Sequence, residues 1–155
     1  RCSEPAGRAR HHDLPGLRRM TTHDIELDVQ AADIDAYGHV NNAVYLTWLD
    51  RAAWSHSAAL GAPLAACIAL RRGMAALRTE IDYERAALAG DRVNVATWIA
   101  ACDGKLRCTR RFVLRRVADR CVLARAQIEY VCLNLDTGRA TRMPPEFVAA
   151  YTPRN

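Results

Sequence analysis

The chain has 155 residues, of which half are hydrophobic and a quarter are charged, so it has the size and composition of one soluble globular domain rather than of a disordered chain. No apolar run approaches the roughly 20 residues that a membrane-spanning helix needs. Most of the net charge of +5 lies near the N-terminus, so it does not indicate a nucleic-acid-binding surface.

Residues 1–19 are predicted to be a disordered leader or an added segment that precedes the folded domain. Five arginines against Glu4 and Asp13 give this stretch a charge of +3, and Met20 is the expected native start. The stretch has no apolar core like that of a secretion signal, and its acidic residues and prolines are atypical of a transit peptide. Residues 20–155 are therefore expected to form a single domain.

The six cysteines are predicted to be small hydrophobic residues of the core. They form no CxxC pair, and none stands beside a histidine in a cluster that could bind a metal, so neither a disulfide framework nor a metal site is indicated. This use of cysteine is typical of a reducing compartment, and we expect the protein in the cytoplasm.

The first predicted elements are a strand and a long helix. Apolar and polar residues alternate over 25–31, which is typical of a strand with one buried face. Apolar residues then recur at three- and four-residue spacings over 44–59, which predicts a helix of about 18 residues that ends near Gly61. Asn41 or Asn42 is suited to cap its first turn.

The rest of the chain is predicted to be four strands and a short helix or coil. The strand-like stretches lie around residues 75–83, 93–99, 113–117 and 122–130, and the helix or coil over 144–151. Short turns between the strands favour an antiparallel meander, with the long helix across its buried face, in an α+β domain. Such a sheet has exposed edges, so we expect a homodimer or a homotetramer.

Polar residues are concentrated where the long helix begins. Asp33, Asp35, His39, Asn41 and Asn42 all lie within ten positions. The free backbone N–H groups of a first helical turn carry partial positive charge and can donate hydrogen bonds to an oxyanion. A carboxylate just upstream can face the same point, so the pair could hydrolyse an activated acyl group.

In this segment the sequence resembles the hotdog-fold acyl-CoA thioesterases, in particular the 4-hydroxybenzoyl-CoA thioesterase group and its long-chain acyl-CoA relatives. Asp35, Gly38, Tyr45 and residues 48–50 fit that family's D-x-x-G-x6-Y-x2-W-L-[DE] pattern, and residues 39–42 match the HVNN stretch of acyl-carrier-protein thioesterases. The resemblance implies a hotdog fold, in which an antiparallel sheet wraps around one long central helix. It also implies hydrolysis of an acyl-CoA or acyl-carrier-protein (acyl-ACP) thioester to a free acid, without a cofactor or a metal.

The resemblance implies catalytic roles for Asp35 and Asn42. Asp35 falls where the family has its catalytic carboxylate, which acts as a nucleophile on the thioester carbonyl or as a general base for water. The backbone N–H of Asn42 falls where the family polarises that carbonyl. Because a helix N-terminus stabilises an ionised carboxylate, we favour the nucleophile. Asp33, two residues away, is expected to be structural.

The resemblance also implies roles in the site for three further positions. His39 falls where the acyl-carrier-protein branch has a catalytic histidine, but Tyr37 stands where that branch has an asparagine. Gly38 would let the backbone approach the substrate closely. Tyr45 is expected to be chiefly a core residue that also lines the acyl site.

Other residue types have simpler interpretations. Asp50 could face the far end of a pocket or only cover solvent, and His56 is expected to be a partly buried structural histidine. Arginines at 110, 111, 115 and 116 could meet the phosphates of CoA, but consecutive strand residues point to opposite faces, so the four cannot form one patch. Two other functions stay open: a thioester hydratase or dehydratase on the same fold, and a non-catalytic acyl-thioester-binding module.

Overall fold

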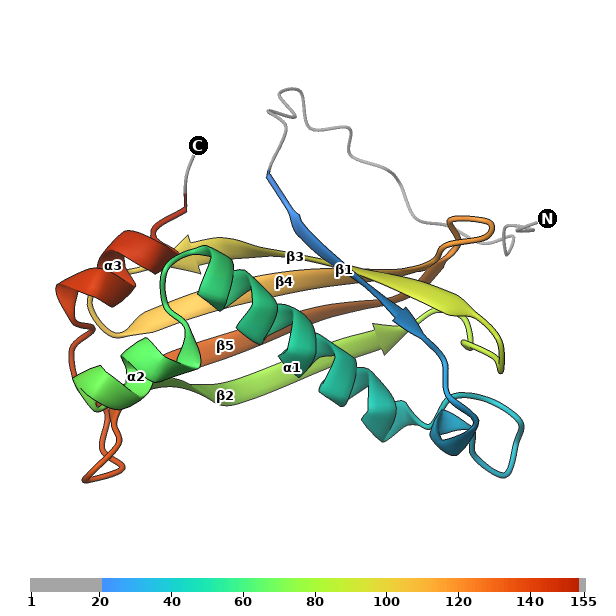
Figure 1. Cartoon of the computed structure of the whole chain (residues 1–155), viewed down its shortest axis with the longest axis horizontal. Coiled ribbons are helices and arrows are strands. Elements are labelled where there is room, and N and C mark those ends of the chain that lie inside the picture. Colours follow the sequence, from blue (N-terminus) through green and yellow to red (C-terminus); the bar gives the residue numbers. More distant parts are fainter. Residues whose placement is uncertain (1–20, 154–155) are drawn as a thin grey trace.

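The computed structural model describes residues 21–153, and the predicted leader over residues 1–19 lies outside this range. The described chain folds into a five-stranded antiparallel sheet, with one long helix across one of its faces (Figure 1). The predicted α+β fold class, with one long helix packed on an antiparallel sheet, is confirmed.

Five strands and three helices make up the described domain, together with one short 3-10 turn over Ala31–Asp33. The strands are β1 (His23–Asp28), β2 (Arg72–Tyr83), β3 (Arg92–Cys102), β4 (Arg107–Arg116) and β5 (Val122–Asn134). The helices are α1 (Asn42–Ala59), α2 (Leu64–Leu70) and α3 (Pro145–Tyr151).

The strand order in the sheet is β1-β3-β4-β5-β2, and every neighbouring pair is antiparallel. Strands β3, β4 and β5 form the predicted meander. The prediction was wrong for β2, which pairs with β5 at the far edge instead of with its successor β3. The alternation of residues within a strand carries no information about its neighbour, so the sequence could not place this crossover.

Helix α1 begins and ends where the sequence predicted. Asn41 is its N-cap, and its side-chain Oδ1 accepts a hydrogen bond from the N–H of Ala43 at 2.9 Å. The helix ends at Ala59, and Gly61 follows with φ +92°, a left-handed conformation that favours glycine. The Asn41 cap sets the position of the N-terminus of α1, around which the predicted site is arranged.

Helix α2 was not predicted, because no element was assigned between the end of the long helix and the strand expected around residues 75–83. Its seven residues form an apolar run too short for helical spacing to be distinguished from a buried strand. The helix ends at Leu70, its C-cap Arg71 has φ +53°, and β2 begins at Arg72. The predicted short helix at the C-terminus is confirmed as α3.

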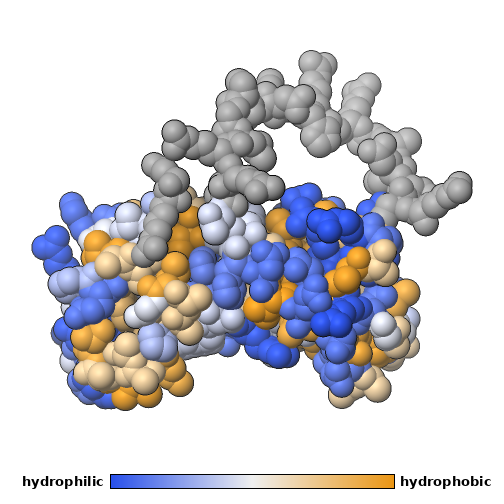
Figure 2. Space-filling view, turned by 45° about the horizontal axis from the view of Figure 1, so that its top comes forward, coloured by the Kyte–Doolittle hydropathy of each residue, from blue (hydrophilic) through white to orange (hydrophobic). Residues whose placement is uncertain are grey.

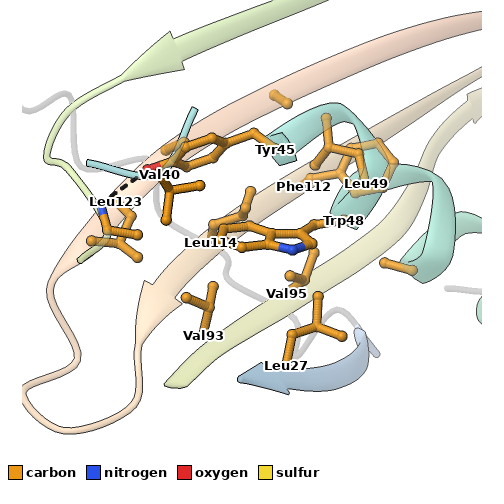
Figure 3. Close-up of a cluster of buried hydrophobic side chains, with 14 of the residues drawn as sticks. Leu27, Val40, Tyr45, Trp48, Leu49, Val93, Val95, Phe112, Leu114 and Leu123 are labelled. Atoms are coloured by element: carbon orange, nitrogen blue, oxygen red, sulfur yellow. Dashed lines mark hydrogen bonds between the residues drawn. The ribbon is translucent and has the colours of Figure 1, made fainter. Parts of the chain in front are cut away.

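The main hydrophobic core lies between α1 and the sheet (Figure 3). Tyr45, Trp48 and Leu49 of α1 are all buried, and they pack in one cluster with Phe112 and Leu114 of β4. The predicted core role of these three α1 residues is confirmed.

A second cluster packs at the other end of the sheet, where α2 and α3 lie near the C-terminal end of α1 (Figure 1). It includes Cys67, Cys108 and Cys132, which are buried and free. This agrees with the predicted role of these three cysteines as small core hydrophobes. For Cys121 the prediction was wrong, because this residue is disulfide-bonded.

The face drawn in Figure 2 carries hydrophobic side chains in separate groups between hydrophilic ones. Among the described residues, no single helix is long and apolar enough to cross a membrane; α1 and α2 pass that test only as a pair, and they are bent by 74° at the break between them.

Candidate active site

Asp35 lies in a tight turn that precedes α1. Its backbone N–H donates to the carbonyl of His39 at 2.7 Å, and the Ile34–Val40 bridge continues this pairing toward the helix. Its side-chain Oδ1 accepts hydrogen bonds from the N–H groups of Tyr37 and His39, at 2.8 and 3.3 Å. The other carboxylate oxygen accepts no hydrogen bond from the described residues, so it is available to a ligand.

Asn42 is the first residue of α1, and its backbone N–H has no hydrogen-bond partner within residues 21–153. The next two amides are occupied, because the N–H groups of Ala43 and Val44 donate to the side chain and the carbonyl of Asn41. The Asn42 carbonyl accepts a hydrogen bond from the Tyr83 hydroxyl at 3.1 Å. Of the first three amides of α1, therefore, the one predicted to polarise a carbonyl is the one left free.

The turn between these two residues contains Gly38 and His39. Gly38 has φ +78°, which favours glycine, and a Cβ there would meet no described atom within 4 Å. The positive φ is thus a sufficient reason for this glycine. The His39 side chain is exposed, and only its backbone contacts Asp35. Close approach of a ligand at Gly38 and catalysis by His39 both stay predictions.

Tyr45 and Asp33 have clear structural contacts. The Tyr45 hydroxyl accepts a hydrogen bond from the N–H of Ala87 at 3.1 Å, and its ring packs against Trp48 (Figure 3). The ring also packs edge-on against Tyr83. The Asp33 side-chain Oδ2 accepts a hydrogen bond from the N–H of Gln30 at 2.8 Å, which closes the 3-10 turn. The expected structural role of Asp33 is observed, whereas the predicted contact of Tyr45 with substrate stays a prediction.

Of the cavities on the described domain, two are well formed, and neither of these is lined by Asp35, His39, Asn42 or Tyr45. One has a volume of about 250 Å³ and lies between α1, α2, α3 and strands β2 to β5. Its walls are mainly apolar, and its polar lining residues are Asp50, Ser57, Thr79, Arg110, Tyr130 and Tyr151. The other, of about 440 Å³, lies between β1, the 3-10 turn and the first turns of α1.

The deepest polar group of the first cavity is Arg110 of β4, which is only 3% exposed. Its guanidinium donates to Nδ1 of His56 at 2.6 Å and to Oγ of Ser57 at 3.1 Å. The Tyr151 hydroxyl also donates to Oγ of Ser57, at 3.1 Å. Within the described residues Arg110 has no ion pair, so a buried positive charge faces this cavity.

Burial sets the ionisation of the groups around Arg110. It lowers the pKa of His56 to about 4, and the charges of Arg110 and His23 add to this, so the imidazole is neutral near pH 7. Burial raises the pKa of Tyr130 to about 12 and also raises the pKa of Tyr151. The neighbours of Arg110 therefore provide hydrogen bonds but no negative charge.

In the sequence, Arg110 is one member of a basic run. The structure separates that run: Arg110 points inward, the side chain of Arg111 pairs with Gln127 on the other face, and Arg116 forms ion pairs with Asp91 and Asp119. The alternation of β4 contains a signal that could have identified Arg110, because this residue is in phase with buried Cys108 and Phe112.

The chain matches the family model described as the thioesterase-like superfamily over residues 29–151. It is 28% identical over 124 residues to the long-chain acyl-CoA thioesterase FadM of Escherichia coli. The aligned region covers 78% of this chain and 90% of FadM.

Among solved structures, a 1,4-dihydroxy-2-naphthoyl-CoA thioesterase from Synechocystis superimposes with a TM-score of 0.75 at 24% identity, covering 84% of this chain and 96% of that one. A Staphylococcus aureus protein solved in complex with CoA gives a TM-score of 0.78 at 18% identity, covering 88% and 89%. These likenesses confirm the predicted hotdog fold.

The family match extends from the end of β1 to the end of α3 and includes the whole Asp35–Asn42 segment. The predicted enzyme class, a thioester hydrolase, is confirmed at the level of the family. The chain belongs to the thioesterase-like superfamily.

Proposed function

We propose that this protein hydrolyses acyl-CoA thioesters to a free carboxylic acid and CoA, with Asp35 as the reacting carboxylate and the Asn42 amide as the group that polarises the carbonyl. The observation that carries the proposal is the free pair of groups at the start of α1. One oxygen of Asp35 is held by backbone amides while the other is free, and the Asn42 N–H is unoccupied within the described residues.

Two routes of hydrolysis are compatible with this arrangement. As a nucleophile, Asp35 forms a bond to the thioester carbonyl carbon, the carbon–sulfur bond breaks, and the thiolate of CoA leaves and takes up a proton. Water then hydrolyses the mixed anhydride and restores the carboxylate. As a general base, Asp35 takes a proton from water, which attacks the carbonyl directly. In both routes the carbonyl oxygen gains negative charge, which the Asn42 amide stabilises.

The family relatives support CoA as the leaving group. One solved relative holds CoA, and the curated relative of E. coli is named an acyl-CoA thioesterase. An acyl-ACP thioester stays a second candidate, on the HVNN match at residues 39–42. The predicted homodimer or homotetramer and the cytoplasmic location are kept as parts of this proposal.

The test is a free-thiol assay with a panel of acyl-CoA thioesters. Asp35→Asn keeps an oxygen that can accept the amides of residues 37 and 39, so the turn should persist while the charge is lost. We expect kcat to fall by roughly 10²–10⁴-fold. If this variant kept near-full activity, the role of Asp35 would be wrong.

The Asn42 amide is tested with Asn42→Pro. Proline is well tolerated at the first position of a helix, and Asn41 before it has ψ 137°, a conformation that a following proline accepts. The variant therefore removes the N–H without breaking α1, and we expect kcat to fall by roughly 10²–10³-fold. Asn42→Ala, which keeps the amide, is the comparison; equal losses in both variants would assign the effect to the side chain.

Single-turnover hydrolysis in ¹⁸O-water tests the nucleophilic route, for which label in the protein is the positive result. An anhydride opened at the Asp35 carboxyl carbon puts the label into the protein, whereas general-base catalysis puts all of it into the released acid. Acyl-CoA that binds without release of thiol would favour the non-catalytic module, and addition of water to an enoyl-CoA without release of thiol would favour the hydratase.

A further inference from the structure

The buried guanidinium of Arg110 lies where the two hydrophobic clusters of the domain meet. On the inner face of β4, Cys108 belongs to the cluster near α2 and α3, and Phe112 belongs to the main core. Arg110 lies between them and also lines the cavity. A charge in such surroundings is strongly unfavourable unless an opposite charge compensates it.

The described residues around Arg110 leave this charge uncompensated. Two of its five N–H donors bind neutral acceptors, His56 and Ser57. Burial keeps the hydroxyls of Tyr130 and Tyr151 and the thiol of Cys108 protonated at neutral pH, because it raises the pKa of each. Burial also lowers the pKa of Arg110, but a guanidinium stays protonated in proteins.

Asp50 is the one acidic residue that lines the cavity, and it does not neutralise Arg110. It is exposed, and no ion pair within residues 21–153 joins it to Arg110. Solvent screens an exposed carboxylate far more than a buried guanidinium. The inner end of the cavity is therefore positive.

The remaining walls suit a hydrocarbon chain. The cavity follows one face of α1 from Leu46 to Ser57, a rise of roughly 16 Å. Met74, Ile99 and Ile128 contribute apolar side chains opposite this face. Leu46 lies one helical turn after Asn42, so the cavity begins near the proposed reacting end and Arg110 lies toward the C-terminal end of α1.

We propose that Arg110 binds a carboxylate at the far end of the acyl group, so that the preferred substrates are thioesters of dicarboxylic acids rather than of simple fatty acids. The inference rests on the proposed thioesterase function and adds the substrate class. The planar fork of a guanidinium matches a carboxylate, and its three unused donors can form two parallel hydrogen bonds. Arg110 is thus a specificity-determining residue that takes no part in the reaction itself.

The first experiment compares pairs of substrates of equal chain length. The mono-CoA thioesters of octanedioic, dodecanedioic and hexadecanedioic acid are matched with octanoyl-, dodecanoyl- and hexadecanoyl-CoA, and kcat/KM is measured from thiol release. For at least one length, the wild type is expected to prefer the dicarboxylic member by roughly 10- to 100-fold. Equal or lower kcat/KM for the dicarboxylic member at every length would overturn the inference.

Arg110→Met tests the residue itself, because methionine has a similar reach without the charge and suits an apolar site. We expect it to lose the preference, so that the dicarboxylic and the simple member of each pair have similar kcat/KM. Arg111→Met is the matched control, since Arg111 is the next residue on β4 and faces outward; it should keep the preference. An equal fall in kcat/KM for both members of each pair in Arg110→Met, with the preference kept, would mean that Arg110 is only structural.

Arg110→Lys is a second variant, for the case that Arg110→Met does not fold. It retains a positive charge without the fork, and we expect it to keep part of the preference. Circular dichroism shows whether each variant is folded. If Arg110→Met does not fold, the wild-type ratio and Arg110→Lys decide the question.

Binding without turnover separates this inference from the proposed function. Calorimetry compares the monomethyl ester of dodecanedioic acid, which has one free carboxylate, with its dimethyl ester. One outcome is that the wild type binds the monoester more tightly than the dimethyl ester, that Arg110→Met binds both alike, and that no thioester is hydrolysed. This outcome would support the anion site and contradict the proposed function. If simple acyl-CoA is hydrolysed and the two esters bind with equal affinity, the thioesterase function is supported and the proposed role of Arg110 is contradicted.

Discussion

At the scale of single residues, His56 shows how burial sets the charge state of a side chain. It packs against His23, with the ring centroids 5.2 Å apart, and its Nδ1 accepts a hydrogen bond from Arg110. A protonated imidazole could not accept that bond and would place a second positive charge beside the guanidinium. The neutral form is therefore part of the folded state, as the low pKa of about 4 indicates.

This neutral histidine predicts a loss of stability in acid. The unfolded chain takes up a proton at His56 near its ordinary pKa of 6.5, whereas the folded chain does so only near pH 4. Stability from this group is thus complete above pH 6.5 and is lost as the pH falls, by at most about 3 kcal/mol. In urea titrations from pH 7 to pH 4, His56→Asn, which keeps an acceptor oxygen, should lose less stability than the wild type.

The control for this measurement is His39→Asn, at an exposed histidine outside the cluster. It should follow the wild-type pH dependence of the free energy of unfolding. If His56→Asn and the wild type gave parallel curves, the neutral buried imidazole would be refuted.

At the scale of elements, the start of α1 combines a structural cap with the proposed catalytic amide. The Asn41 side chain occupies the Ala43 amide, and the Asn41 backbone N–H donates to the carbonyl of Asp33 at 2.8 Å. These bonds tie the helix to the turn that carries Asp35. The position of the free Asn42 amide therefore depends on the cap.

The cap can be tested by its contribution to stability. Asn41→Ala removes the acceptor for the Ala43 amide and should lower the free energy of unfolding by about 1 kcal/mol. Asn41→Ser, which supplies another good capping oxygen, should stay close to the wild type. Equal stability of the two variants in urea denaturation would show that the side-chain cap contributes little.

At the scale of the whole molecule, β2 forms one edge of the sheet and exposes large apolar side chains. Leu77, at the irregularity in the β2–β5 register, is 52% exposed, and Tyr83 is 45% exposed. The described chain leaves the outer backbone groups of this edge without a strand partner. An apolar, unpaired edge is typical of a surface that associates with another copy.

This edge predicts how association could be disrupted. If the protein is a dimer through β2, Leu77→Lys should reduce the mass measured by light scattering after gel filtration to that of one chain, because a charge would be buried in the interface. Val117→Lys, at another exposed apolar residue, should keep the wild-type mass. An unchanged dimer mass in Leu77→Lys would place the interface elsewhere, and a monomeric wild type would refute the prediction.

Much of the fold was predictable because its signals are local. The spacing of apolar residues over 44–59, Gly61 after them and a cap at Asn41 or Asn42 predicted α1, because capping and amphipathic periodicity act within a few positions. The structure decided between the two caps in favour of Asn41. The short apolar run of α2 carried no such spacing, and β2 reached the far edge through a crossover that no local pattern records.

The candidate site, too, was predictable where its signals are local and unpredictable where it depends on long-range packing. The sequence by itself determined that Asp35 and Asn42 flank the start of a helix, because they are seven positions apart and joined by one turn. Only the tertiary structure decided that Arg110 of β4, His56 and Ser57 of α1 and Tyr151 of α3 meet in one buried cluster. Long-range packing brings these residues together, and it also sets the burial on which their charge states depend, so no spacing along the chain could reveal them.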